Sequence, residues 1–277
     1  MRPRILLPLL TYPDASTVAA LPRALGLAAT LNAEVTAIVH EVDIPPITEP
    51  LANLVLDVEA MSKAAETLSR DRGAELTRAV RQQAERIALP LEVETFRGDR
   101  LSGERIASRA RTYDLTILLC EKDSPDHALL QEEVLFRSGG PVVVLPPEEG
   151  SFHLNKIAVA WDGTRAAARA LRDALGVLRE ARRVVVLTAT EEKAILAASV
   201  AEVLAFLKAH EIVAEHRDVP FSGNSAIGDV LQQAALDEDA GLLVMGAYGH
   251  SRMREFIMGG ATKSVLRAPR LPLLMSH

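Results

Sequence analysis

The chain has 277 residues, of which 48% are hydrophobic and 25% charged, and its formal net charge is −6. This length fits one large domain or two of about 100–150 residues, with a composition ordinary for a soluble globular protein. The negative charge argues against a general nucleic-acid binder, and no apolar run approaches the roughly 18 residues of a membrane span. The N-terminal segment lacks the pattern of a secretory signal, and Cys120, the only cysteine, allows no intrachain disulfide, so we expect a cytoplasmic protein.

The first half of the chain predicts five strands separated by helices. Short apolar runs at 5–10, 35–39, 91–96, 115–119 and 141–145 predict the strands, and helical patterns fall near 15–31 and 57–88. The helix near 57–88 carries charges of both signs at helical spacing, which is typical of a solvated face. The preceding segment 44–50, rich in proline, is expected to be a loop over the first domain, with a partner contact as the alternative.

The second half repeats the same order of elements. Strands are expected at 157–161, 184–187, 212–219, 242–245 and 272–275, with helices near 164–181 and 191–210. Strands that alternate with helices predict doubly wound α/β domains, each a five-stranded, mostly parallel sheet with helices on both faces. The segment Pro146–Ser151 is the natural linker and gives domains at 1–147 and 152–277.

A glycine-rich segment follows the fourth strand of the second half. Gly246, Gly249, Gly259 and Gly260 lie between that strand and a helical pattern. Glycines let a backbone approach an anion closely, and the N–H groups at a helix start can bind it, so this order predicts a phosphate site. Counted from Cys120 to Pro141, the first half has five residues fewer, and its segment 120–127 has no glycine and several ionisable groups, which predicts a poor host for an anionic ligand.

The spacing Gly-x2-Gly-x9-Gly, with Val-Met before it and Trp-Asp-Gly-Thr at 161–164, resembles the nucleotide loop of the universal stress protein family. The repeat and the length resemble the tandem, two-domain form of that family, which implies an adenine-nucleotide alpha-hydrolase-like fold. The resemblance implies that Asp162 contacts the adenosine part of the ligand. It implies the remaining contacts at Ala160, Leu187, Thr188, Met245, Gly246, Gly249, Gly259, Gly260, Ala261 and Thr262.

One position departs from the family pattern, and several residues have a second interpretation. Gly260 stands where many ATP-binding members carry serine or threonine, so the implied ligand is ATP or another adenine nucleotide, with or without Mg²⁺. Asp162 could instead be the cap of a helix. Arg252 and Arg254 could clamp phosphates or could form a solvated face. His250 has no partner in the sequence for a catalytic triad, and the histidines lack metal-ligand spacing, so neither catalytic nor metal-binding residues are predicted.

The functional expectation is a stress-linked regulator that binds an adenine nucleotide in its second domain, beside a degenerate first domain. Any ATP hydrolysis by this regulator is expected to be slow, because no general base or nucleophile is evident. Two alternatives are an interaction scaffold with a relic glycine loop, and an enzyme that is a genuine nucleotide hydrolase or transferase. The resemblance further implies that strands 142–145 and 273–275 pair within the chain and make the tandem an internal pseudo-dimer. A homodimer and an unidentified protein partner are left open, and no nucleic acid or membrane is expected.

Overall fold

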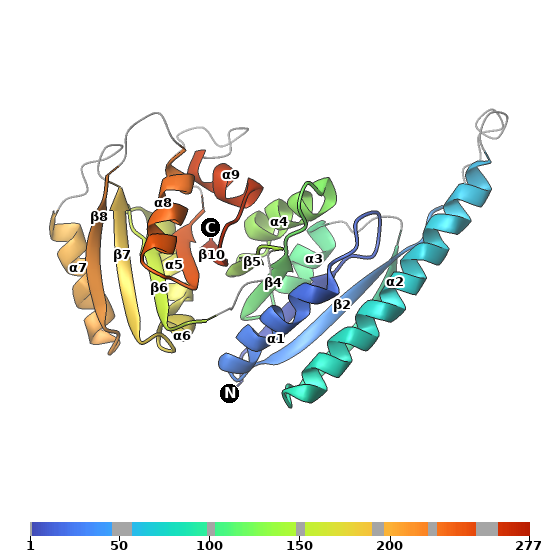
Figure 1. The fold of residues 1–277 in the computed structure, drawn as a ribbon, viewed down its shortest axis with the longest axis horizontal. Helices are drawn as coiled ribbons and strands as arrows, with labels where there is room; N and C mark the ends of the chain where they lie inside the picture. Colours follow the sequence, from blue (N-terminus) through green and yellow to red (C-terminus); the bar gives the residue numbers. More distant parts are fainter. Residues whose placement is uncertain are drawn as a thin grey trace.

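The strands of both halves join into one sheet. In the computed structural model, residues 2–45, 57–98, 103–147, 153–189, 197–220, 226–247 and 260–277 are described. The first half supplies β1 (Arg4–Leu9), β2 (Glu34–Val42), β3 (Leu91–Gly98), β4 (Leu115–Leu119) and β5 (Val142–Leu145). The second half supplies β6 (Lys156–Ala160), β7 (Arg183–Ala189), β8 (Ala214–Val219), β9 (Leu242–Gly246) and β10 (Leu273–Ser276). The ten strands lie in the order β3-β2-β1-β4-β5-β10-β9-β6-β7-β8 (Figure 1).

The two halves meet at the only antiparallel pair among these strands. Within each half every pairing is parallel, whereas Leu273, Leu274 and Met275 of β10 pair antiparallel with Val144, Val143 and Val142 of β5. The expected pairing of the last strands within one chain is therefore present. Because the strands of the two halves run in opposite directions, their carboxyl ends lie at opposite edges of the shared sheet.

Helices cover both faces of the sheet, as the doubly wound pattern predicts. One apolar layer joins the strands to η1 (Val18–Ala20), α1 (Leu21–Thr30), α2 (Val58–Arg86), α5 (Arg165–Asp173), α6 (Leu175–Leu178) and α7 (Ala197–Ala209). The other joins them to α3 (Gly103–Ala110), α4 (Pro125–Arg137), α8 (Ile227–Asp237) and α9 (Gly260–Arg267). Strands such as β4 and β5 are buried along their whole length because apolar side chains on both of their faces meet a helical layer.

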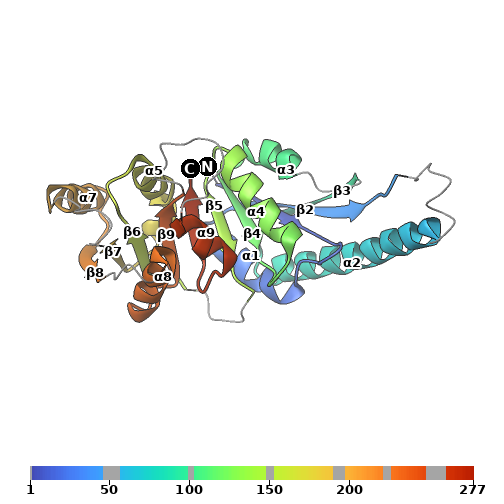
Figure 2. The same ribbon diagram turned by 90° about the horizontal axis from the view of Figure 1, so that it is seen from above.

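Helix α2 shows how the charge pattern found in the sequence is used. Its buried residues, Ala65, Ser69, Gly73, Leu76, Val80 and Ala84, recur every three or four positions and form one stripe against β2. Figures 1 and 2 show α2 lying along β2 and extending beyond it. Most of the charged residues face solvent as expected, but Arg72 turns inward and donates to the backbone carbonyls of Thr11 and Pro13.

The element boundaries differ from the sequence expectations in small ways. The helix expected near 164–181 is divided at Ala174 into α5 and α6, and the helix near 15–31 begins only at Val18, as the turn η1. Residues 148–151 of the predicted linker, residue 152 and the segment 46–56 lie outside the described residues, so the expectations for them stay predictions.

Candidate functional site at the carboxyl edge of the second half

Asp162 lies just beyond β6, at the start of α5. Its Oδ1 accepts hydrogen bonds from the backbone N–H of Thr164 at 2.9 Å and from the Thr164 hydroxyl at 2.6 Å. The Thr164 Oγ1 in turn accepts from the N–H of Ala167 at 3.2 Å, so Thr164 is the N-cap of α5. The alternative that Asp162 itself caps the helix is therefore wrong by two positions: Asp162 orients the capping residue, because a carboxylate oxygen fixes the hydroxyl proton of Thr164.

Gly246, the last residue of β9, touches the backbone of the first turn of α5. A Cβ at this position would lie 2.5 Å from the carbonyl carbon of Ala166 and 2.5 Å from the nitrogen of Ala167. No side chain fits at such distances, because the atoms that it would meet belong to the helix backbone and cannot rotate away. The close approach brings the end of β9 to the same helix start that Asp162 orients.

Ala160 and Leu187 lie side by side on β6 and β7, and Thr188 follows Leu187. The Leu187 carbonyl accepts from the N–H of Trp161 at 2.9 Å, so that carbonyl is already used within the sheet. Met245 is buried on β9, beside Met275 of β10. The structure thus brings Ala160, Leu187 and Met245 to the carboxyl edge, with Leu187 and Met245 in the apolar layer below it.

The side chain of Thr188 is buried and engaged with β8. Its hydroxyl donates to Asp218 Oδ1 at 2.8 Å, and its oxygen lies 2.9 Å from His216 Nε2. Since the single hydroxyl proton is used on Asp218, His216 Nε2 must be the donor in the second contact. No pattern in the sequence predicts this network, because its members meet only when β7 and β8 pair.

The phosphate side of the expected site is only partly described. Gly260 begins α9, and Ala261 and Thr262 lie in its first turn, where the Thr262 side chain is buried. Gly249, His250, Arg252, Arg254 and Gly259 lie outside the described residues, so their assigned roles stay predictions. Because β9 and β10 are parallel, α9 runs back across the sheet and begins at the carboxyl edge, on the side where β9 ends.

The carboxyl edge of the first half, at the opposite side of the sheet, has different residues. Pairing of β1 with β4 and of β6 with β9 places Leu10 where the second half has Asp162, and Leu119 where it has Gly246. Counted in this register, the first half is shorter by four residues between the fourth strand and the last proline, not by five. The difference of one arises because Cys120 corresponds to Ala247 rather than to Gly246.

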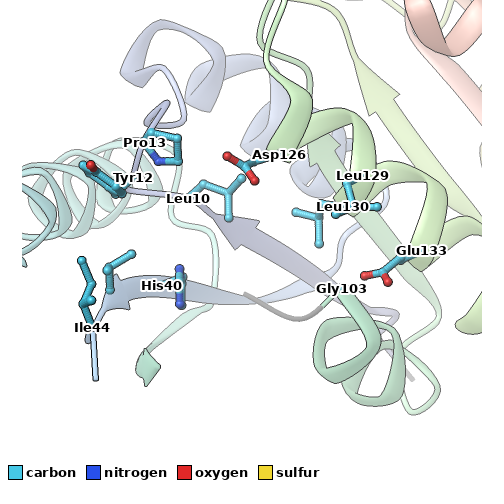
Figure 3. A pocket seen from close by; sticks show the side chains of 11 residues that line it. Leu10, Tyr12, Pro13, His40, Ile44, Gly103, Asp126, Leu129, Leu130 and Glu133 are labelled. Carbon is cyan, nitrogen blue, oxygen red and sulfur yellow. The ribbon is translucent and has the colours of Figure 1, made fainter. Parts of the chain in front are cut away.

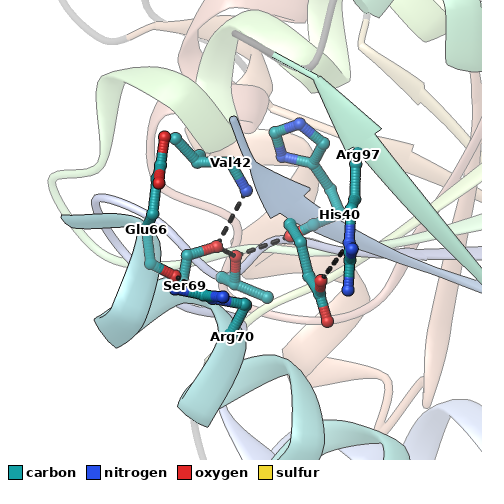
Figure 4. Close-up of polar contacts among 8 residues, drawn as sticks. His40, Val42, Glu66, Ser69, Arg70 and Arg97 are labelled. Atoms are coloured by element: carbon teal, nitrogen blue, oxygen red, sulfur yellow. Dashed lines mark hydrogen bonds and ion pairs between the residues drawn. The ribbon is translucent and has the colours of Figure 1, made fainter. Parts of the chain in front are cut away.

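Buried hydrogen bonds close part of this edge in the first half. The Thr11 hydroxyl donates to the His40 carbonyl at 2.6 Å and lies 2.6 Å from the hydroxyl of Ser69 (Figure 4). Ser69 Oγ also accepts from the N–H of Val42 at 2.8 Å. These contacts hold α2 against the ends of β1 and β2. No local pattern predicts them, because Ser69 is fifty-eight positions from Thr11.

Beside these contacts lies a cavity of about 440 Å³, which no pattern in the sequence predicts. Leu10 of the β1 end, His40 and Val42 of β2, and Leu130 of α4 line it (Figure 3). Cys120, nearby at the end of β4, is buried, and burial raises the pKa of its thiol. The thiol is therefore a weak nucleophile.

Among the helices of the described ranges, none is both long and apolar enough to cross a membrane. Within the same ranges no group of three or more histidine, cysteine, aspartate or glutamate side chains is arranged to hold a metal ion.

The second half matches a known family, and the whole fold matches solved structures. Residues 153–277 match the universal stress protein family. A universal stress protein from Archaeoglobus fulgidus DSM 4304 is 18% identical and superposes with a TM-score of 0.70, covering 98% of this chain and 95% of its own. A protein of unknown function from Pseudomonas aeruginosa PAO1 is 14% identical with a TM-score of 0.60, covering 99% of this chain and 92% of its own.

Two further comparisons complete the findings. A universal stress protein solved in complex with cAMP is 23% identical over 44% of this chain and 97% of its own, with a TM-score of 0.36. No curated protein matches the sequence.

The fold is that of a tandem α/β protein whose two halves share one sheet. Residues 153–277 match the universal stress protein family, and both halves together superpose on a universal stress protein structure, which is consistent with a tandem form of that fold.

Proposed function

We propose that this chain is a cytoplasmic, nucleotide-responsive regulator that binds ATP or a related adenine nucleotide at the carboxyl edge of its second half. The nucleotide would lie across the ends of β6, β7 and β9, in the crevice where α/β sheets of this kind bind ligands. Asp162, Ala160 and Thr188 would face the adenosine, and Gly246 and the glycines that follow would face the phosphates. A protein partner of unspecified identity would recognise the nucleotide-bound form.

The observation that carries this proposal is the meeting of β9 with the start of α5. Gly246 lies against Ala166 and Ala167, in the helix turn that Asp162 and Thr164 organise. Two residues about eighty positions apart in the chain are therefore neighbours at one edge. The first turn of α9 begins at the same edge with a glycine, and helix N-termini favour anions.

A second candidate, a scaffold that binds no nucleotide, is favoured by the packing of two of the same residues. Gly246 is required by its contact with α5 whether or not a ligand binds. The hydroxyl of Thr188 is already engaged with β8. Both residues thus have structural roles that would persist in a protein whose nucleotide site has been lost.

The test uses the full chain and separates the ligand role of Asp162 from its structural role. Asp162→Asn keeps an Oδ1 that can accept from Thr164, but removes the charge and one acceptor oxygen. We expect about tenfold weaker ATP binding by isothermal titration calorimetry, because a hydrogen bond to a charged group contributes about 1.5–3 kcal/mol. Thr164→Val is the matched control: it removes the cap, lowers stability by about 1 kcal/mol and leaves the affinity within a fewfold of wild type.

Unchanged affinity in Asp162→Asn would remove Asp162 from the site. Absence of binding by ATP, ADP, AMP and cAMP at millimolar concentration, with no nucleotide released from the purified protein on denaturation, would overturn the proposed function in favour of the scaffold. Mass spectrometry of the released small molecules provides that second measurement.

A further inference from the structure

The cavity in the first half lies between α4 and the ends of β1 and β2. Its volume of about 440 Å³ falls within the range of pockets that hold small organic ligands. It lies at the sheet edge opposite to that of the proposed nucleotide site, because the two halves run antiparallel. A ligand here would therefore bind independently of the second half.

One face of α4 gives this cavity its chemical character. Asp126, Leu129, Leu130 and Glu133 follow the helical spacing of three, four and seven positions, so all four line the cavity. Two carboxylates thus stand at the two ends of an apolar stretch. Seven residues of helix rise by about 10 Å, which sets the approximate distance between the two carboxylates along the helix. Figure 3 shows both carboxylates turned from α4 toward the cavity.

The opposite wall is mostly apolar, and the residues that the structure describes there include no lysine or arginine. Leu10, Val42 and Ile44 face α4, and Tyr12 and Pro13 close one end. The ring of His40 lines the floor and stacks on Phe96, with the ring centroids 5.6 Å apart. Among the described lining residues Asp126 and Glu133 are the only aspartate, glutamate, lysine or arginine side chains, so the cavity favours cations over anions.

The wall formed by the segment after β1 is fixed by its neighbours. The two ring nitrogens of the buried His127 lie 3.0 Å from the Leu119 carbonyl and 3.1 Å from the Asp14 carbonyl. From the other side Arg72 donates to the carbonyls of Thr11 and Pro13 at 3.2 and 2.8 Å. A wall held by both α2 and α4 needs little ordering when a ligand enters, which lowers the cost of binding.

The carboxylate of Glu133 lies against the start of α3. Gly103, the first residue of α3, lies so close to Glu133 that any side chain at Gly103 would overlap the carboxylate. The positive end of the α3 dipole therefore faces this group. Asp126, in the first turn of α4, has the same relation to its own helix.

From this arrangement we propose that the first half binds an elongated organic dication with an alkyl middle, of the diamine or polyamine class. One ammonium group pairs with Asp126 and the other with Glu133. The methylene chain between them packs on Leu129 and Leu130 and against the wall formed by β1 and β2. This explains why the first half, which has lost the residues for an anion, still keeps a preformed cavity at the corresponding edge.

Spermidine is the probe, titrated into the full chain by isothermal titration calorimetry at physiological salt. We expect saturable binding with one site per chain, and about tenfold weaker binding in Asp126→Asn and in Glu133→Gln, because each variant removes one charge-assisted hydrogen bond. Glu132→Gln is the matched control, since it removes the same charge from the neighbouring position of α4, which does not line the cavity. n-Butylamine, which has the alkyl chain but only one ammonium group, can pair with only one of the two carboxylates and should bind much more weakly than spermidine.

A variant that alters shape without altering charge keeps the test independent of surface electrostatics. Leu129 lines the cavity but its side chain is half exposed, so Leu129→Trp is tolerated by the fold and should abolish spermidine binding by filling the space. The proposal is overturned if wild type does not bind spermidine, if Glu132→Gln weakens binding as much as Glu133→Gln, or if n-butylamine binds as well as spermidine. Far-ultraviolet circular dichroism of each variant checks that α4 is intact.

Discussion

Gly246 offers the sharpest test of how the second half is held together. In Gly246→Ala the new methyl carbon would lie 2.5 Å from the Ala166 carbonyl carbon, 2.5 Å from the Ala167 nitrogen and 2.8 Å from the Ala166 carbonyl oxygen. Ordinary contacts between carbon atoms are about 3.5–4.0 Å, so α5 must move away from β9. Forced overpacking of this kind costs about 1–3 kcal/mol, and the rigid backbone partner places Gly246→Ala near the upper limit.

The small gain from restricting the unfolded chain, about 0.4–1 kcal/mol, offsets part of that cost. We expect a net loss of about 2–3 kcal/mol in the free energy of unfolding, which corresponds to a melting temperature lower by about 5–10 °C. Urea unfolding followed by circular dichroism, without nucleotide, measures the loss. The control is Gly176→Ala in α6, where a Cβ has no atom within 4 Å and alanine favours the helix, so its stability should rise by about 0.5–1 kcal/mol.

A Gly246→Ala protein as stable as wild type would refute the packing argument. If that protein were also unable to bind ATP, the glycine would be needed for the ligand alone. The contact of β9 with α5 would then not account for the glycine.

Three further outcomes follow from side chains elsewhere. Thr188→Val keeps the shape but removes the contacts with Asp218 and His216, and should cost about 1–2 kcal/mol in urea unfolding; no loss would show that the network contributes nothing. Burial raises the pKa of Glu238, but hydrogen bonds from Lys156 and Arg217 outweigh this and hold the pKa below its ordinary value of 4.5. Its folded pKa is thus lower than its unfolded pKa, so Glu238→Gln should destabilise the protein at pH 7, and the difference should shrink as the pH falls below 4.5. A difference independent of pH would contradict this. The Cys120 thiol, whose pKa is raised by burial, should react with Ellman's reagent far more slowly in the native protein than in urea, and equal rates would show that the site is open.

Local patterns in the sequence were sufficient to predict the order of the helices and strands. The apolar run 115–119 predicts β4 to the residue, and the α2 stripe follows from its spacing, because short-range periodicity states which side chains must be buried. The position of Asp162 after the first strand of the second half likewise locates the edge of a site. The sequence did not predict the hydrogen bonds of Asp162 to Thr164. The same residues are compatible with Asp162 as the helix cap and with Asp162 two positions before the cap.

Contacts between distant segments could not be derived in this way. Thr188 meets Asp218 and His216 only because β7 and β8 pair in one register. The alignment of the two halves was wrong by one residue at Cys120 because no periodic signal fixes where a buried strand ends, whereas strand pairing does. The cavity beside α4 depends on α2, α4 and two strands at once, and no single stretch of sequence describes it.

The sequence by itself determined the repeat, the α/β class, the resemblance of the second half to universal stress proteins and the loss of the glycine segment in the first. Those properties depend on local periodicity and on residue types at fixed spacing, which the chain states directly. Only the tertiary structure decided the antiparallel register in which β5 and β10 join the two sheets, that Gly246 is required by α5, and that the first half retains a cavity with carboxylates at both ends. Each of these depends on which surfaces face one another after the chain has folded, and pairing across large sequence separations is set by packing rather than by any local pattern.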